Sequence, residues 1–182
     1  MLIRQATSHD YPAILALQAK NTPENLNAQQ RQQGFIVSEM NEAQVAKLND
    51  ELGILIAEQD GRLAGFVCLA RPNMQPRPPV VDAMLSELAN HYFADTLITK
   101  QRLFLYGPVC LASDWRGKGV LKRLFNAVKT RTRDQFDIGI LFINQSNPHS
   151  LAAHVKGLGM TILGEFSSQG EHYQLLAFTP RI

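Results

Sequence analysis

The segment from residue 103 to residue 144 follows the order strand, glycine-containing turn, helix, strand. Residues 103–112 and 138–144 are apolar runs of strand length, whereas residues 120–133 repeat apolar side chains at helical spacing. Two strands joined through a helix in this way lie parallel in one sheet, with the helix packed on a face of that sheet. The unit therefore requires a sheet covered by at least one helix.

Other segments predict further strands and helices beside this unit. Residues 54–58 and 63–70 are apolar runs joined by Asp60-Gly61, a dipeptide typical of tight hairpins. Residues 161–166 and 173–178 predict a second strand pair, and residues 21–33 are polar and ambiguous. A further strand is predicted at 2–6, and helices are predicted after Ser8-His9-Asp10, at 40–48 and at 148–156. Another helix is predicted after the proline-rich residues 71–79, and its apolar side carries Met84, Leu85, Leu88 and Tyr92. The predicted fold class is α/β (α+β), a mixed sheet flanked by helices.

Length and charge restrict the classes of function. The 182 residues are enough for one domain, predicted to span 1–182, and 45% apolar with 19% charged residues is typical of a globular protein. The net charge of +2 is nearly balanced, which argues against nucleic acid as a partner. A basic cluster at residues 116–133 could still serve a smaller anion.

The two cysteines and the N-terminus carry no signal for a metal, for secretion or for a membrane. Cys68 and Cys110 lie within apolar runs and lack zinc-ligand spacing, so we expect both to be reduced and buried, with no metal site. Residues 1–6 lack the apolar core of a signal peptide, and no run reaches the length of a membrane span. We therefore expect a cytoplasmic protein without a membrane partner.

The turn Arg116-Gly117-Lys118-Gly119 has the composition of an anion-binding loop. Glycines allow successive backbone N–H groups to turn toward one anion, and the helix that follows adds its first-turn donors and its dipole. Neither the ATP-binding nor the dinucleotide-binding glycine pattern is present. The loop therefore predicts a pyrophosphate site, with a plain basic turn as the alternative.

The residues around this loop resemble the GNAT superfamily of N-acetyltransferases, whose signature Arg/Gln-x-x-Gly-x-Gly/Ala binds the pyrophosphate of acetyl-CoA. Arg116 and Gly119 match the two most distinctive positions, and Trp115 takes the usual aromatic place. Leu121 replaces the usual small residue, which implies altered loop or helix packing. The resemblance implies a mostly antiparallel sheet with helices on both faces and acetyl-CoA as cosubstrate. It implies that the cofactor is bound by Val109, Cys110, Leu111, Arg116, Gly117, Lys118, Gly119, Val120, Leu121, Asn147 and Ser150.

A second block of the same family, Asn-x-x-Ala followed by a tyrosine and Gly-Phe, resembles residues 147–160. Asn147 and Gly159 match in register, and Ser150 is a small residue where alanine is common. His154 stands in the position of the tyrosine that usually protonates the departing thiolate, so the resemblance implies this acid role for it. A packing histidine is the alternative for His154. Asn147 also suits a helix cap before Pro148.

Gly107-Pro108 interrupts the strand at 103–112. Proline removes a ladder donor and glycine loosens the chain, which favours a bulge and divergence from the next strand. In the family such a splay exposes backbone that binds the pantetheine arm, here residues 109–111, and a backbone N–H of Cys110 or Leu111 would polarise the thioester carbonyl. An ordinary edge irregularity is the alternative.

The resemblance predicts direct transfer of an acetyl group to an amine of a small molecule, peptide or protein. Alternatives are a GNAT-like acyl-CoA sensor without turnover, an O-acetyltransferase and a longer-acyl transferase. The acceptor pocket is expected from residues 21–47, the proline-rich loop and the last hairpin, and the helix after residue 79 leaves a homodimer open. The sequence does not identify the general base, which could be a water chain or one of Glu39, Glu42, Glu58, Tyr106, Glu165 and His172.

Overall fold

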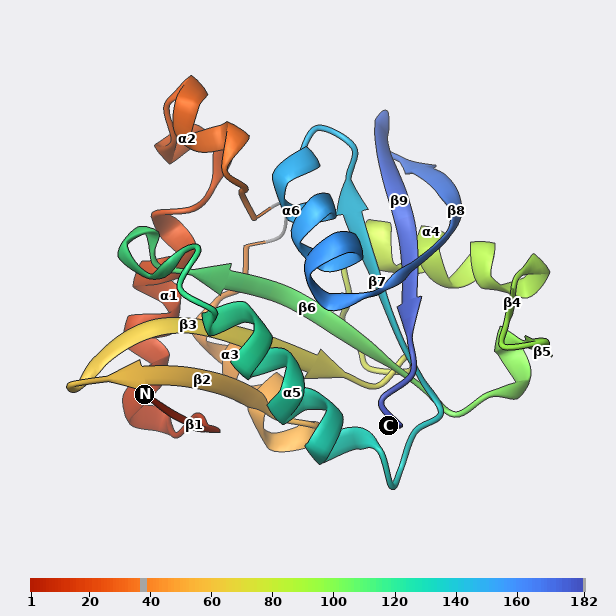
Figure 1. The fold of residues 1–182 in the computed structure, drawn as a ribbon, viewed down its shortest axis with the longest axis horizontal. Helices are drawn as coiled ribbons and strands as arrows, with labels where there is room; N and C mark the ends of the chain where they lie inside the picture. The colour runs from red at the N-terminus through yellow and green to blue at the C-terminus, as the bar shows by residue number, and fades with distance from the viewer. Residues whose placement is uncertain (37–38, 182) are drawn as a thin grey trace.

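A computed structural model describes residues 1–36 and 39–181 of the chain. Its main feature is a seven-stranded sheet in the order β1-β2-β3-β6-β7-β9-β8 (Figure 1). The strands are β1 Leu2–Gln5, β2 Ile54–Gln59, β3 Arg62–Ala70, β6 Leu103–Leu111, β7 Ile138–Asn144, β8 Thr161–Ser168 and β9 Glu171–Phe178. β6 and β7 pair in parallel, and the other neighbours in this order are antiparallel. The predicted mixed, mostly antiparallel sheet is confirmed.

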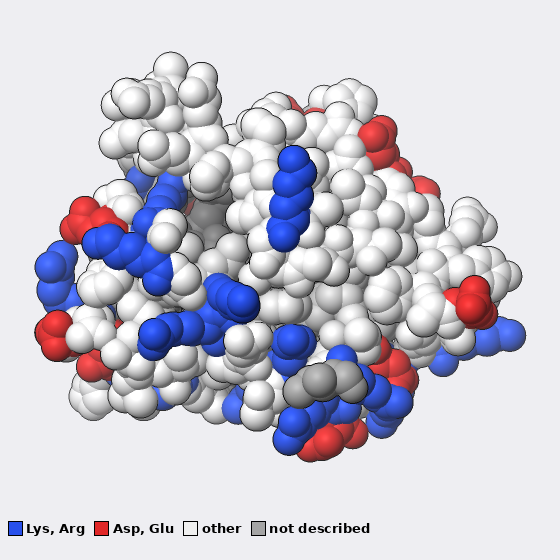
Figure 2. Space-filling view, viewed as in Figure 1, with Lys and Arg blue, Asp and Glu red and all other residues white. Residues whose placement is uncertain are grey.

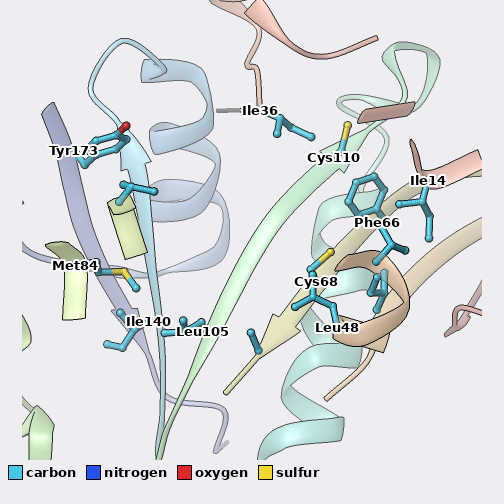
Figure 3. Close-up of a cluster of buried hydrophobic side chains, with 14 of the residues drawn as sticks. Ile14, Ile36, Leu48, Phe66, Cys68, Met84, Leu105, Cys110, Ile140 and Tyr173 are labelled. Atoms are coloured by element: carbon cyan, nitrogen blue, oxygen red, sulfur yellow. The ribbon is translucent and has the colours of Figure 1, made fainter. Parts of the chain in front are cut away.

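Helices cover both faces of the sheet. On one face lie α1 Tyr11–Ala19, α3 Glu42–Glu51 and α4 Pro79–Glu87, whose apolar side chains form a core with Phe66, Ile140 and neighbouring strand residues (Figure 3). On the other face lie α5 Val120–Thr132 and α6 Pro148–Ala152, in front of the sheet in Figure 1. The short elements outside these layers are α2 Ala28–Gln32, β4 Tyr92–Phe93 and β5 Thr96–Leu97.

The apolar spacing of α5 explains its position. Val120, Leu124, Phe125 and Val128 recur at helical intervals and are buried against the sheet, while the charged residues between them face outward. The helix runs without interruption from Val120 to Thr132. Leu121, which replaces the usual small residue, is half-buried in its first turn.

Two predicted helices differ from the structure. α4 ends at Glu87, a 3₁₀ turn follows, and Tyr92 lies in β4 with 65% of its surface exposed, so this tyrosine is not on the helix face. The helix predicted at 148–156 is α-helical only to Ala152 and continues as a π-turn over Ala153–Gly157. A π-turn inserts one extra residue into a helix, which apolar spacing does not reveal.

The predicted irregularity of β6 is present and opens the sheet. Val67 of β3 pairs with Val109 of β6, and Leu69 pairs with Tyr106. Cys68 on β3 therefore lies opposite both Gly107 and Pro108 on β6, which form a bulge. On its other side β6 pairs with β7 only from Leu103 to Leu105. Beyond that point the two strands diverge as a V (Figure 1), and the end of β6 loses its β7 partner.

In the described part of the chain no helix is both long and apolar enough to cross a bilayer.

Candidate functional site

The divergence of β6 and β7 creates a cleft at the C-terminal ends of these strands. All the predicted site residues except Lys118 line it, although they come from three separate segments of the chain. They are Val109, Cys110, Leu111, Arg116, Gly117, Gly119, Val120, Leu121, Asn147, Ser150 and His154. The strand, the loop and α6 thus bring the two family-like sequence blocks together around one cavity.

The loop before α5 leaves backbone donors free at the cleft. Gly117 and Gly119 have φ angles of 71° and 78°, in the left-handed region that favours glycine. The helical ladder begins with the Arg123 N–H, which donates to the Gly119 carbonyl at 3.2 Å. The N–H groups of Val120, Leu121 and Lys122 therefore precede the ladder, and no side chain caps them at Gly119. Such a helix start attracts an anion.

The two basic side chains of the loop are directed elsewhere. Arg116 donates to the Gln33 carbonyl at 2.8 Å and to Asn21 Oδ1 at 2.7 Å, and Lys118 Nζ lies 5.3 Å from the ring centroid of Trp115. Arg116 thus links Gln33 and Asn21 to the loop, while Lys118 is not part of the lining of the cleft. The first turn of α5 adds Lys122 and Arg123, and Lys and Arg side chains gather in this region of the surface (Figure 2), so the surroundings of the cleft remain basic.

His154 is a buried histidine with one nitrogen free. The residue is 5% exposed, and Nδ1 lies 2.8 Å from the Ser150 carbonyl oxygen. Because that oxygen can only accept, Nδ1 carries the hydrogen and Nε2 presents a lone pair. Nε2 is buried and has no hydrogen-bond partner among the described residues. Burial lowers the pKa of His154, so the imidazole is neutral at pH 7.

The π-turn places His154 against β6. Its ring meets the ring of Tyr106 edge to face, with centroids 5.8 Å apart. The Tyr106 hydroxyl is also buried and lacks a partner among the described residues, and its burial raises the pKa of the phenol. The pair joins α6 to the strand that opens the cleft.

Asn147 occupies the N-cap position of α6, but its side chain does not cap that helix. Its Nδ2 donates to the Phe35 carbonyl at 3.2 Å, while its buried Oδ1 has no partner in the described chain. The predicted capping bond is therefore wrong, because the amide turns toward residues 33–36 instead. A residue that lines the cleft thus keeps an acceptor atom without a partner among the described residues.

A second pocket adjoins the cleft and lies between β6, β7, α3, α4 and the proline-rich loop. Six of the described residues line both cavities: Phe35, Ile36, Val109, Asn147, Ser150 and His154. Among the candidate bases, Glu39 and Tyr106 line the second pocket, whereas Glu42, Glu58, Glu165 and His172 are not part of its lining. The last hairpin supplies none of the described lining residues, unlike the expectation from the sequence.

Residues 33–36 belong to the predicted acceptor region, but their place in the cleft beside α5 was not predicted from the sequence. Gln33 and Gly34 line the cleft, and Phe35 and Ile36 line both cavities. The available signal was a short apolar island, Phe35-Ile36, after a polar run. The neighbouring positions 37 and 38 of the predicted acceptor region lie outside the described residues.

The two cysteines are buried and unpaired, as predicted. Cys110 lines the cleft, but burial raises the pKa of its thiol to about 12, so it stays protonated at neutral pH. It is therefore unsuited to act as a nucleophile. Residues 1–36 and 39–181 contain no cluster of His, Cys, Asp and Glu that could hold a metal ion.

The buried histidine predicts a pH-dependent stability. Below about pH 6.5 the unfolded chain binds a proton at His154 that the folded chain does not, so stability falls as pH falls through this window. In His154→Phe the slope of unfolding free energy against pH is expected to be shallower, by at most about 1.4 kcal/mol per pH unit. Urea unfolding from pH 7.5 to 5 measures both slopes, and equal slopes would contradict the neutral buried state.

Comparison with known proteins identifies the class to which this fold and cleft belong. The sequence model described as the Acetyltransferase (GNAT) family matches residues 12–160. The chain therefore belongs to the GNAT family of acetyltransferases, and the resemblance seen in the sequence is confirmed. No curated protein sequence matches the chain.

Solved structures share the whole fold at low sequence identity. Protein smu.2055 from Streptococcus mutans has a TM-score of 0.68 at 14% identity, with 100% of both chains covered. The ribosomal-protein-alanine N-acetyltransferase from Brucella melitensis has a TM-score of 0.63 at 18% identity, covering 98% of this chain and 99% of that one. The yncA protein from Salmonella typhimurium, solved with its cofactor acetyl-CoA, has a TM-score of 0.61 at 14% identity, covering 100% and 95%.

Proposed function

We propose that this chain, acting as a single domain, transfers an acetyl group from acetyl-CoA directly to an amine. The observation that carries the proposal is that His154 lines both cavities while its buried Nε2 has no partner among the described residues. One cavity ends at an uncapped helix start suited to an anion, and the other provides room for a second substrate. Two substrates can then meet beside a buried base.

The cleft residues fit the chemical groups of acetyl-CoA. The N–H groups at the start of α5 would hold the pyrophosphate, and basic residues on that helix, such as Lys122, lie near enough to its start to meet a further phosphate. The backbone of residues 109–111, which lacks a β7 partner, would pair with the amides of the pantetheine arm. The Asn147 Oδ1 would accept one further amide hydrogen.

His154 then moves one proton between the two substrates. The acceptor binds as a neutral amine after losing its ammonium proton to solvent, and its nitrogen attacks the thioester carbonyl carbon. As the C–N bond forms, Nε2 takes a proton from that nitrogen; as the C–S bond breaks, Nε2 gives the proton to the thiolate. Because Nε2 starts unprotonated, His154 acts first as a base and then as the acid implied by its family position.

A thermal-shift titration and a thiol-release assay test the proposal. Acetyl-CoA is expected to raise the melting temperature of the purified chain, because it binds the folded state alone. Free thiol is then expected to appear when the complex is offered a panel of amines. No stabilisation by acetyl-CoA would contradict the cofactor assignment. Stabilisation without turnover on any amine would favour an acyl-CoA sensor instead.

A further inference from the structure

We propose that the acceptor is a primary amine on an apolar body that carries no second charge. This inference rests on the proposed N-acetyl transfer and names the substrate class of the same site. It is drawn from the second pocket, whose lining, charges and position relative to His154 each restrict what can bind there.

The walls of the second pocket are dominated by flexible and aliphatic apolar side chains. Three methionines reach it from three segments, Met40 before α3, Met74 in the proline-rich loop and Met84 on α4. Other apolar lining residues include Ile36, Leu48, Val81, Leu105, Ile140 and Phe142. Methionine adapts its shape to a ligand, so such walls suit an alkyl or aromatic body.

The charged groups near this pocket are engaged elsewhere or solvated. Arg77 pairs with Asp82 at 2.6 Å and also donates to the Pro72 carbonyl, and the Arg71 guanidinium lies 5.3 Å from the ring centroid of Phe136. Glu39 is the acidic residue among the described lining residues, and it is exposed. The apolar interior thus offers no buried counter-charge, in its described part, for a second ammonium or a carboxylate.

His154 determines which chemical group of the acceptor can react. The residue lines both cavities, and its buried Nε2 lacks a hydrogen-bond partner among the described residues, so this lone pair requires a hydrogen-bond donor. An amine N–H is such a donor. An apolar pocket also disfavours the charged ammonium, which lowers the pKa of the bound amine and supplies the neutral nucleophile that transfer needs.

A matched pair of amines tests the inference. Hexylamine and 1,6-diaminohexane have the same carbon chain and differ only in the second amino group. We expect kcat/KM for hexylamine to exceed that for the diamine by at least tenfold, because the second ammonium must enter an apolar pocket whose described part holds no buried counter-charge. Mass spectrometry of the acetylated products, with thiol release as the rate assay, measures the ratio.

Two variants locate the effect in this pocket. Met74→Glu places a carboxylate in its wall and is expected to lower the hexylamine-to-diamine ratio at least tenfold. Asn73→Glu adds the same charge to the neighbouring exposed position, which does not line the pocket, and is expected to leave the ratio unchanged. Because each variant is judged by a ratio, partial loss of stability does not change the conclusion.

The outcomes separate this inference from the proposed function. Equal or preferred turnover of the diamine would overturn the apolar acceptor while acetyl transfer stands. If no amine is acetylated, the proposed function fails. The inference is then tested alone by calorimetry, which measures the affinities of hexylamine and the diamine for the chain saturated with CoA. Tighter binding of hexylamine that Met74→Glu reverses would support the pocket's preference, whereas equal or absent binding would overturn it.

Discussion

Replacement of His154 by phenylalanine is expected to lower kcat for acetyl transfer by about 10²- to 10⁴-fold. The phenyl ring keeps the edge contact with Tyr106 but removes the Nε2 lone pair that receives and returns the proton. Acetyl-CoA binding, measured by thermal shift, is expected to persist because the anion site lies at the start of α5. Initial rates of thiol release at saturating substrates give the change in kcat.

The pH profile separates proton transfer from packing. In the natural chain kcat is expected to fall at low pH as Nε2 becomes protonated, and this limb is expected to be absent in His154→Phe. His9→Phe, at an exposed position outside both cavities, provides the matched control with unchanged rate. Undiminished turnover in His154→Phe would remove the histidine from the mechanism.

Replacement of Gly119 by valine is expected to weaken acetyl-CoA binding by about 10- to 100-fold. A β-branched residue is strained at the φ of 78° found there, and a loop that relaxes would turn the N–H groups of Val120 and Leu121 away from the cleft. Hydrogen bonds to a charged group contribute about 1.5–3 kcal/mol each, which sets the size of the loss. Isothermal titration calorimetry measures the dissociation constant.

Gly170→Val is the matched control for backbone strain. Gly170 has a φ of 80°, and, as at Gly119, an added Cβ meets no atom within 4 Å. It lies in the β8–β9 turn, outside both cavities, so this variant is expected to lose similar stability but to bind acetyl-CoA normally. Equal loss of binding in both variants would show that general destabilisation, not the loop, was responsible.

The parts of the fold that local chemistry determines were predictable from the sequence. The hairpin across Asp60-Gly61, the amphipathic α5 and the bulge at Gly107-Pro108 each depend on a few neighbouring residues, and each is found where expected. The sheet divergence follows from that bulge, because a strand that leaves its register cannot keep pairing with the next one.

The parts that depend on distant contacts were not predictable. Arg116 looks like a phosphate ligand in the sequence, yet its guanidinium is bonded to Asn21 and Gln33, which lie more than eighty residues away. The neutral state of His154 depends on its burial, and burial follows from packing against Tyr106 on β6. No short motif encodes such pairings, so the resemblance located the site without describing its hydrogen bonds.

The segment from Gln33 to Ile36 has a thermodynamic consequence. Arg116 holds one end of it and Asn147 the other, and Phe35 and Ile36 form part of the wall of both cavities. A ligand that displaces either attachment in one cavity therefore reshapes the other. By linkage, the factor by which one substrate changes the affinity of the second must equal the factor in the reverse direction. We therefore expect the two substrates to bind as a coupled pair, because both contact Phe35 and Ile36.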